Sequence, residues 1–186
     1  MHINRNIFDG IALITPDVFG DERGYFYESF SEERYAPVTG GLRFVQDNIS
    51  KSKQGVVRGL HYQTGEFAQG KLCHVLKGRV LDVAVDIRFG SPTFGRYFAA
   101  ELSEDNHHQL WIPPGYAHGF SVLSEEVLFH YKCTAPYNKA SERAIRFDDA
   151  AIGIDWQIAE PVVSPKDLSA LPLAEIARDF VFSEMP

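Results

Sequence analysis

Residues 71–88 read KLCHVLKGRVLDVAVDIR, and this stretch decides the fold class. Apolar and β-branched residues dominate Lys71–Lys77, and a second run of the same kind covers Val80–Arg88. Between the two runs stands Lys77-Gly78-Arg79, where the glycine allows the backbone of a tight hairpin. The stretch therefore predicts two antiparallel strands joined by a short turn.

Short β-branched or aromatic runs separated by turn residues recur along most of the chain. The predicted strands are Tyr25–Phe30, Leu42–Asn48, Val56–Tyr62, Lys71–Lys77, Val80–Arg88, Arg96–Ser103, Gln109–Ile112, Gly119–Leu123 and Val127–Thr134. Helices are expected only as short segments at Ser31–Tyr35 and Leu173–Phe180, so long crossover helices for a parallel sheet are missing. We expect an all-β fold, a barrel or sandwich of mainly antiparallel strands.

The length of 186 residues suits one domain with a single core. The sequence shows no internal repeat and no linker composition, so residues 1–186 are expected to form a single domain. Residues 135–186 are less regular and rich in Asp, Pro and isolated apolar residues. We interpret them as a packed tail of that domain.

Charge and composition exclude several classes of partner. The formal net charge of −7 argues against nucleic acid, while a few cations in a cleft could still hold a small phosphorylated ligand. The sequence has neither a signal-peptide pattern nor an apolar run of about eighteen residues, so a membrane partner is not expected and a cytoplasmic location is. In that compartment Cys73 and Cys133 are expected to be reduced thiols.

Residues 58–78, RGLHYQTGEFAQGKLCHVLKG, concentrate one arginine, two histidines and two lysines. Gly65–Lys71 matches the first seven positions of a phosphate-binding loop, but Leu72 stands where a metal-binding Ser or Thr is needed. Such a loop must also open a helix, whereas this segment continues as a strand. The pattern therefore argues against a phosphate-binding loop.

Side-chain alternation predicts how the polar residues of this segment are oriented. Lys71 and Cys73 share one face of their strand, and His74 lies on the other, where a partly buried structural role is expected. Arg58 and His61 fall on opposite faces unless their strand contains a bulge.

Residues 109–120, QLWIPPGYAHGF, place His118 three residues after the glycine of a rigid Pro-Pro-Gly turn. This arrangement resembles the second motif of cupins, small β-barrels that hold a metal with a His-x-His pair, a Glu and a later His. The first half is missing, because His61 and His74 are not spaced as His-x-His and no glutamate stands at the required place. A catalytic metal usually needs three protein ligands, so we expect a site with no metal and no cofactor.

Eight segments resemble, in order and spacing, the dTDP-4-dehydrorhamnose 3,5-epimerase family. They are FGDERGYFYESF, FVQDN, RGLHYQ, QGKL, SPTFG, QLWIPPGYAHGF, YKCTAPY and SPKD. The resemblance runs from about Ile7 to Pro172 and implies a metal-free cupin with a jelly-roll core, acting as a homodimer on a dTDP-sugar. The implied reaction converts dTDP-4-dehydro-6-deoxy-D-glucose to dTDP-4-dehydro-L-rhamnose by proton removal and return at C3 and C5, in dTDP-L-rhamnose biosynthesis.

The resemblance also implies the catalytic residues. His61 would remove the protons, Asp167 would orient its ring, Lys71 would stabilise charge on the C4 oxygen, and Tyr131 would donate a proton on the opposite face. An epimerase that works beside a ketone needs a base, an oxyanion stabiliser and an acid, and these residue types supply all three. If Lys71 and Tyr131 face the interior, Cys73 and Cys133 should face it too, each two residues further along the same strand.

Substrate contacts follow from the same resemblance. They are Arg23, Glu28, Gln46, Asn48, Arg58, His118, Tyr137, Glu142 and Lys166. The family dimer partly shares its sites through the N-terminal strands, which makes Arg23 and Glu28 candidates to serve the neighbouring subunit. Gln46 and Asn48 alternate to one face of their strand, as shared ligand contacts require.

Three other functions remain open at this stage. An epimerase that acts at C3 only would use the same base and lysine. A non-catalytic sugar-nucleotide-binding cupin would bind dTDP without exchanging carbon-bound protons. A metal-dependent cupin oxygenase would carry stoichiometric iron.

Overall fold

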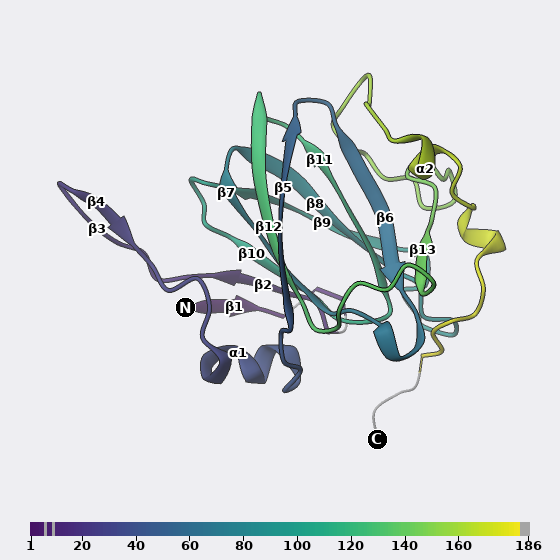
Figure 1. Cartoon of the computed structure of the whole chain (residues 1–186), viewed down its shortest axis with the longest axis horizontal. Helices are drawn as coiled ribbons and strands as arrows, with labels where there is room; N and C mark the ends of the chain where they lie inside the picture. The colour runs from purple at the N-terminus through teal and green to yellow at the C-terminus, as the bar shows by residue number, and fades with distance from the viewer. Residues whose placement is uncertain (6, 9, 183–186) are drawn as a thin grey trace.

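The computed structural model describes residues 1–5, 7–8 and 10–182, and its body consists of two antiparallel sheets (Figure 1). In order across the first sheet, the strands are β1 (His2–Asn4), β2 (Ala12–Thr15), β10 (Gln109–Ile112), β7 (Lys71–Lys77), β12 (Glu126–Cys133) and β5 (Gln46–Lys53). The second sheet contains β13 (Glu142–Ala144), β6 (Val57–Gln63), β11 (Tyr116–Val122), β8 (Arg79–Asp86) and β9 (Tyr97–Ser103). The all-β antiparallel class predicted from the sequence is confirmed.

The remaining elements are short. Strands β3 (Phe19–Asp21) and β4 (Gly24–Phe26) form a hairpin that extends away from the body, and we call residues 18–27 the arm (Figure 1). Helix α1 spans Glu32–Thr39 and helix α2 spans Pro165–Leu168, with single 3-10 turns at Gly65–Phe67 and Leu173–Glu175. None of the helices within the described residues has both the length and the apolar character needed to cross a bilayer.

Strand β8 shows how the two faces of a sheet are buried differently. Val80 and Ala84 point between the sheets, where they pack with residues such as Val75 and Phe129 of the opposite sheet. Leu81, Val83 and Val85 point to the other face and pack with residues of the C-terminal segment. Residues covering that face are Ile145, Phe147, Ile152, Trp156, Leu173 and Ile176. These residues lie within the segment 135–186 that was expected to be a packed tail, of which residues 183–186 lie outside the described part of the chain.

Several predicted elements need correction. The strands at Lys71–Lys77 and Gln109–Ile112 are confirmed to the residue. The strand expected at Leu42–Asn48 is instead Gln46–Lys53, because its inward face is polar and carries no apolar alternation to detect. The helix expected at Leu173–Phe180 is only a 3-10 turn, since Leu173 and Ile176 are buried by an otherwise extended tail.

Other predicted boundaries also differ from those in the structure. Strand β11 begins at Tyr116 rather than at Gly119, and the strand expected at Tyr25–Phe30 is the short β4 of the arm. Helix α1 continues to Thr39, four residues beyond the predicted end. Strands β1, β2, β3 and β13 were not predicted from the sequence, and each has only three or four residues.

Candidate active site

One cavity between the sheets, with a volume of about 140 Å³, gathers most of the predicted catalytic residues. Its lining residues are Ser50, Arg58, His61, Lys71, His118, Gly119, Phe120 and Tyr131. They come from strands β5, β6, β7, β11 and β12, so both sheets contribute. Five residues that the sequence analysis singled out are therefore brought together in one place.

His61 and Asp167 form a close pair at this cavity. His61 Nε2 lies 2.6 Å from Asp167 Oδ1, and the Asp167 side chain is almost fully buried. Burial by itself would raise the pKa of Asp167, but the hydrogen bond and charge of His61, with the Gly59 N–H and Ser164, hold that pKa below its ordinary value. Ser164 caps helix α2 by accepting a hydrogen bond from the Asp167 N–H, which positions the carboxylate. Asp167 is therefore an ionised, oriented partner of the imidazole.

Arg58 and His61 line the same cavity although simple alternation places them on opposite faces. The reason is an irregularity in the pairing of β6 with β11, where His61 pairs with His118 but Arg58 pairs with Phe120. Strand β6 thus has one residue more than β11 in this interval, as in a β-bulge. The sequence analysis placed Arg58 and His61 on opposite faces unless their strand contains a bulge, and the structure has an irregularity of that kind.

Lys71 is a buried cation at the cavity, only 8% exposed. Its Nζ donates a hydrogen bond to the carbonyl oxygen of His61 at 3.3 Å, which links β7 to β6. A buried ammonium keeps unused donor capacity, since it has three hydrogens to give. It can therefore stabilise negative charge that develops in the cavity.

Tyr131 reaches the cavity from β12. Burial raises its pKa to about 12, so the phenol stays protonated over the physiological range and can act only as a proton donor there. Cys73 pairs with Tyr131 across the strands, and both Cys73 and Cys133 are buried free thiols. The predicted inward orientation of the two cysteines is confirmed.

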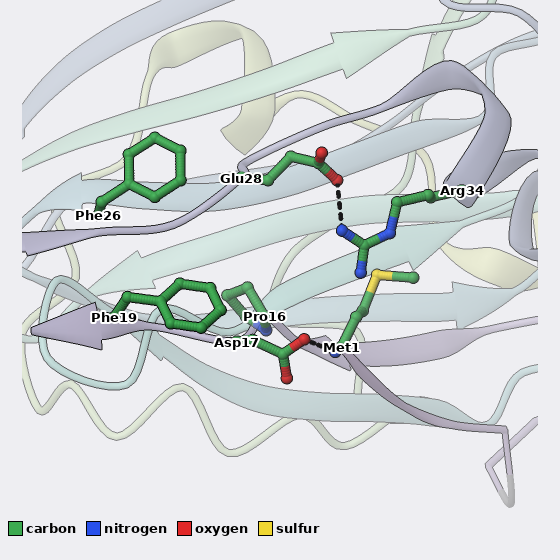
Figure 2. Close-up of a pocket in the computed structure, with 7 residues that line it drawn as sticks. All are labelled: Met1, Pro16, Asp17, Phe19, Phe26, Glu28 and Arg34. Carbon is green, nitrogen blue, oxygen red and sulfur yellow. Dashed lines mark hydrogen bonds and ion pairs between the residues drawn. The ribbon is translucent and has the colours of Figure 1, made fainter.

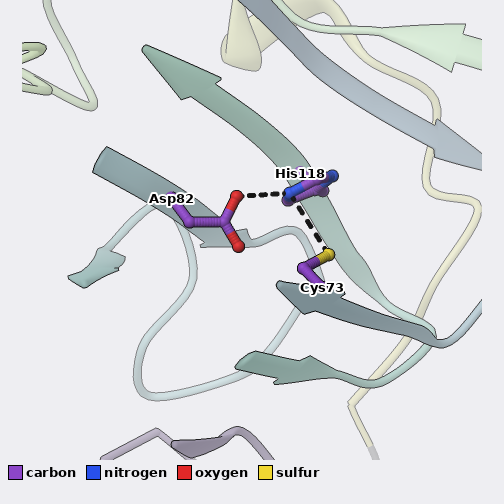
Figure 3. Close-up of side chains that lie close together, drawn as sticks. All are labelled: Cys73, Asp82 and His118. Carbon is purple, nitrogen blue, oxygen red and sulfur yellow. Dashed lines mark hydrogen bonds and ion pairs between the residues drawn. The ribbon is translucent and has the colours of Figure 1, made fainter. Parts of the chain in front are cut away.

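His118 is held by a carboxylate that the sequence analysis did not single out. Its Nε2 lies 2.7 Å from Oδ1 of Asp82, which has no exposed surface. Burial lowers the pKa of His118, and the charge of Asp82 opposes that shift only in part. Cys73 Sγ lies 3.6 Å from the same nitrogen, so these three side chains form the one group of potential metal ligands found within the described residues (Figure 3).

A polar rim borders the cavity on the side of β5, β13 and α2. Glu142 Oε2 accepts a hydrogen bond from the Tyr137 hydroxyl at 3.1 Å and lies 2.6 Å from Lys166 Nζ. The Tyr137 N–H donates to Gln46 Oε1 at 2.8 Å, and Gln46 in turn donates to Asn48. Five of the predicted substrate contacts thus form one hydrogen-bonded surface.

Arg23 and Glu28 are not brought to this cavity within the chain. Arg23 lies at the tip of the arm, where its guanidinium is exposed and pairs with Asp21. Glu28 lies at the base of the arm and pairs with Arg34 at 3.0 Å (Figure 2). There it lines a separate cavity of about 230 Å³ together with Phe19 and Phe26. Two of the nine predicted contacts therefore lie away from this cavity within one chain.

Sequence reasoning missed Ser50 and Asp82. Ser50 Oγ is buried at the cavity without a hydrogen-bond partner among the described residues. The sequence feature that could have identified Ser50 is its position, two residues beyond Asn48 on the face that Gln46 and Asn48 share. The signal of Asp82 was its place inside an apolar strand, because a carboxylate is buried only where it has a partner or a task.

Comparisons with known proteins show the family to which the chain belongs. The family described as dTDP-4-dehydrorhamnose 3,5-epimerase matches residues 6–175. The enzyme of that name from Salmonella typhimurium is 49% identical over 179 residues, covering 95% of this chain and 97% of the relative. A dTDP-6-deoxy-D-glucose-3,5-epimerase from Legionella pneumophila, solved in complex with dTDP-4-keto-L-rhamnose, superposes with a TM-score of 0.93 at 49% identity and covers 98% of both chains. A dTDP-4-dehydrorhamnose 3-epimerase from Streptomyces niveus is 37% identical, covering 92% of this chain and 83% of the relative.

Proposed function

The chain belongs to the dTDP-4-dehydrorhamnose 3,5-epimerase family, and we propose that it converts dTDP-4-dehydro-6-deoxy-D-glucose to dTDP-4-dehydro-L-rhamnose in the synthesis of dTDP-L-rhamnose. The reaction inverts C3 and C5, the two carbons beside the C4 ketone. One observation supports the proposal above all others: a carboxylate-bound histidine, a buried lysine and a protonated tyrosine line the same small cavity.

His61 is the base in this proposal. The Asp167 carboxylate binds Nε2, which fixes the ring and stabilises the imidazolium that forms when the other ring nitrogen takes a proton from carbon. The two residues lie 106 positions apart in the sequence, and the capped helix α2 brings them together.

Lys71 stabilises the intermediate. Removing a proton next to the ketone places negative charge on the C4 oxygen, and a preorganised ammonium stabilises that charge. The buried position of Lys71 fits this role. We assign no step to a metal or other cofactor, because the lysine supplies the positive charge that the enolate needs.

Tyr131 returns a proton from the face opposite the base. It lies on the six-stranded sheet, whereas His61 lies on the five-stranded sheet, so the two side chains reach the cavity from facing sheets. Inversion requires this arrangement, since the proton must leave one face of the ring and arrive at the other.

The cavity takes the sugar, and the polar rim takes the nucleotide. The cavity has a volume of about 140 Å³, which is below the roughly 300–1,000 Å³ of pockets that enclose drug-sized ligands. A dTDP-sugar must therefore extend beyond it, across the surface formed by Tyr137, Glu142, Lys166 and Gln46. Arg58 lines the cavity itself, where its guanidinium is a suitable partner for a phosphate.

The same proposal includes a homodimer in the cytoplasm. The arm exposes Phe19, Tyr25 and Phe26 by more than 60% each, which is unusual for a monomer unless another surface covers them. An arm that reaches a second copy would carry Arg23 to the neighbouring cavity. The cytoplasmic location is supported by Cys73 and Cys133, which are free thiols.

Two alternatives use the same cavity. The 37% identical 3-epimerase shows that inversion at C3 alone occurs among relatives, and the cavity could serve that reaction. A non-catalytic binding protein would not need the oriented histidine, the buried lysine and the protonated tyrosine together.

Solvent deuterium incorporation separates these functions. The purified protein is incubated in D₂O with dTDP-4-dehydro-6-deoxy-D-glucose, and NMR follows the C3 and C5 protons. We expect deuterium at both carbons and the L-rhamno product. Label at C3 alone would establish the 3-epimerase, and an unlabelled substrate would refute catalysis.

A further inference from the structure

Cys73, Asp82 and His118 form a compact group next to the cavity, separate from the His61–Asp167 pair (Figure 3). The three residues come from strands β7, β8 and β11, and their ligand atoms all lie within 4.8 Å of one another. Cys73 and Asp82 have no exposed surface, and His118 is 6% exposed. Donors from two facing sheets thus converge on one buried point.

The geometry is not that of a nucleophilic triad. In such a triad the carboxylate and the nucleophile bind opposite nitrogens of the histidine ring. Here Asp82 Oδ1 and Cys73 Sγ both approach Nε2, at 2.7 Å and 3.6 Å. A sulfur, a nitrogen and an oxygen that surround one position have instead the arrangement of metal ligands.

The distances are close to those that zinc requires. Tetrahedral zinc has bonds of about 2.3 Å to sulfur and about 2.0–2.1 Å to nitrogen, which separates these two ligand atoms by about 3.5 Å. The Sγ–Nε2 distance of 3.6 Å already fits. The Nε2–Oδ1 distance of 2.7 Å is a hydrogen bond, so the carboxylate must move by roughly half an ångström or bind through Oδ2.

Asp82 provides an independent indication of a cation. Its Oδ2 is buried and has no hydrogen-bond partner among the described residues. Leaving a buried carboxylate oxygen unsatisfied is costly, and a bound cation removes that cost. Zinc with one thiolate, one carboxylate and one neutral imidazole has no net charge, which suits a buried site.

We propose that Cys73, Asp82 and His118 bind one zinc ion, and that the bound ion inhibits the enzyme. On binding, the Cys73 thiol releases its proton to solvent, and the His118 proton moves from Nε2 to Nδ1 so that Nε2 can ligate. His118 lines the cavity, so fixing its ring on an ion would change the surface against which the sugar is proposed to lie. The inhibition, but not the binding, rests on the function proposed above.

Cobalt titration of the full-length, chelator-treated protein tests the binding. Co²⁺ replaces zinc in such sites, and a thiolate ligand gives it a sulfur-to-metal charge-transfer band in the near ultraviolet. We expect this band to saturate at one cobalt per chain and to disappear when zinc is added. Absence of the band at millimolar cobalt would overturn the site.

Variants locate the ligands. Loss of an outer partner of a metal ligand already costs about 10–100-fold in affinity, so Asp82→Asn should weaken binding by at least that factor. Cys73→Ser should abolish the charge-transfer band. Cys133→Ser is the matched control, because it removes the other buried thiol and should retain the band. Loss of the band in Cys133→Ser would refute the assignment even if Cys73→Ser failed to fold.

Turnover measured against zinc concentration tests the inhibition. The activity of the wild type should fall with the same midpoint as zinc binding, whereas Cys73→Ser should lose this sensitivity. Full activity of the zinc-saturated protein would refute inhibition and leave the binding site established by the cobalt band. A protein without epimerase activity would refute the proposed function, and the cobalt band would still decide the site.

Discussion

Gly59 on β6 and Gly119 on β11 pack backbone against backbone, since a Cβ on Gly59 would lie 2.5 Å from the Cα of Gly119. Gly59 also has a φ of +119°, which side-chain-bearing residues rarely adopt. This contact lies at the irregularity that turns Arg58 and His61 toward one cavity. The shape of the active site therefore depends on two missing side chains.

Gly59→Ala should be strongly destabilising. Backbone strain and overpacking each cost about 1–3 kcal/mol, so the free energy of unfolding should fall by about 2–6 kcal/mol. Gly65→Ala is the matched control, because Gly65 also has a positive φ, of +63°, but faces open space. It should cost about 1–2 kcal/mol. Urea unfolding measures both, and equal stability of the two variants would contradict the role given to the contact.

Asp167→Asn should lower kcat by about 10²–10⁴-fold with little effect on KM. The amide keeps the size of the side chain but removes the charge that would stabilise a His61 imidazolium, and it leaves the proposed nucleotide-binding rim unchanged. Steady-state kinetics measure the effect, and Asp105→Asn, at an exposed turn, is the control. A kcat close to that of the wild type would argue against an acid–base role for the His61–Asp167 pair.

Tyr131→Phe should nearly abolish inversion while leaving the fold intact. The substitution removes only the hydroxyl, and the ring keeps its packing near Phe129. The rate of product formation should fall by about 10²–10⁴-fold. The base can still remove protons, so the rate of deuterium exchange should fall less than the rate of product formation. NMR measures exchange and inversion in one sample, with Tyr97→Phe as control. Normal inversion by Tyr131→Phe would require another proton donor.

The strands that the sequence predicted best are those with an apolar face. Strand β7 was predicted to the residue because its inner face packs in the core. Strand β5 was predicted at the wrong position because its inward residues, Gln46, Asn48, Ser50 and Ser52, are polar. A polar inward face thus lacks the apolar alternation from which strands are predicted, as is expected where side chains are proposed to contact a ligand.

The residues of the predicted site also differ in how well the sequence indicated them. His61, Lys71 and Tyr131 were expected in one place and line one cavity. Asp167 could not be placed by periodicity, since 106 residues separate it from His61, and only the resemblance to a family indicated it. Asp82 lacked even that indication, and its importance becomes visible only when β8 lies beside β11.

His74 should make stability depend on pH. Burial lowers its pKa to about 4, His130 and Lys132 add repulsion, and Asp47 opposes the shift. The unfolded chain, with a histidine pKa of about 6.5, therefore binds more protons than the folded protein between these values. The contribution of His74 to the free energy of unfolding is fully present above about pH 6.5 and is lost as the pH falls toward about 4.

The expected loss between about pH 7 and about pH 5 is about 2 kcal/mol, and His74→Gln should remove that part of the pH dependence. Urea unfolding of both proteins at the two pH values measures the difference. His2→Gln, at an exposed position, is the control. An unchanged pH dependence in His74→Gln would show that His74 is not the group responsible.

Mixed dimers should reveal whether the arm of one chain completes the cavity of another. Arg23 lies at the tip of the arm, whereas His61 lies in the body, and within one chain they do not line the same cavity. If a site combines His61 of one chain with Arg23 of its partner, a dimer of one Arg23→Ala chain and one His61→Asn chain contains one intact site. Random mixing of the two inactive proteins should then restore about a quarter of the wild-type sites.

His61→Asn mixed with Lys71→Ala is the control for this experiment. Both residues belong to the body of the same chain, so every site in the mixed dimer keeps one defect and activity should not return. Subunits are exchanged by refolding the two variants together, and turnover is compared with that of each variant alone. Recovery in both mixtures would point to reassembly artefacts, and recovery in neither would place Arg23 outside the shared site. Recovery only with Arg23→Ala requires the arm to cross to the second subunit, because no other arrangement of a twofold dimer joins an intact Arg23 to an intact His61.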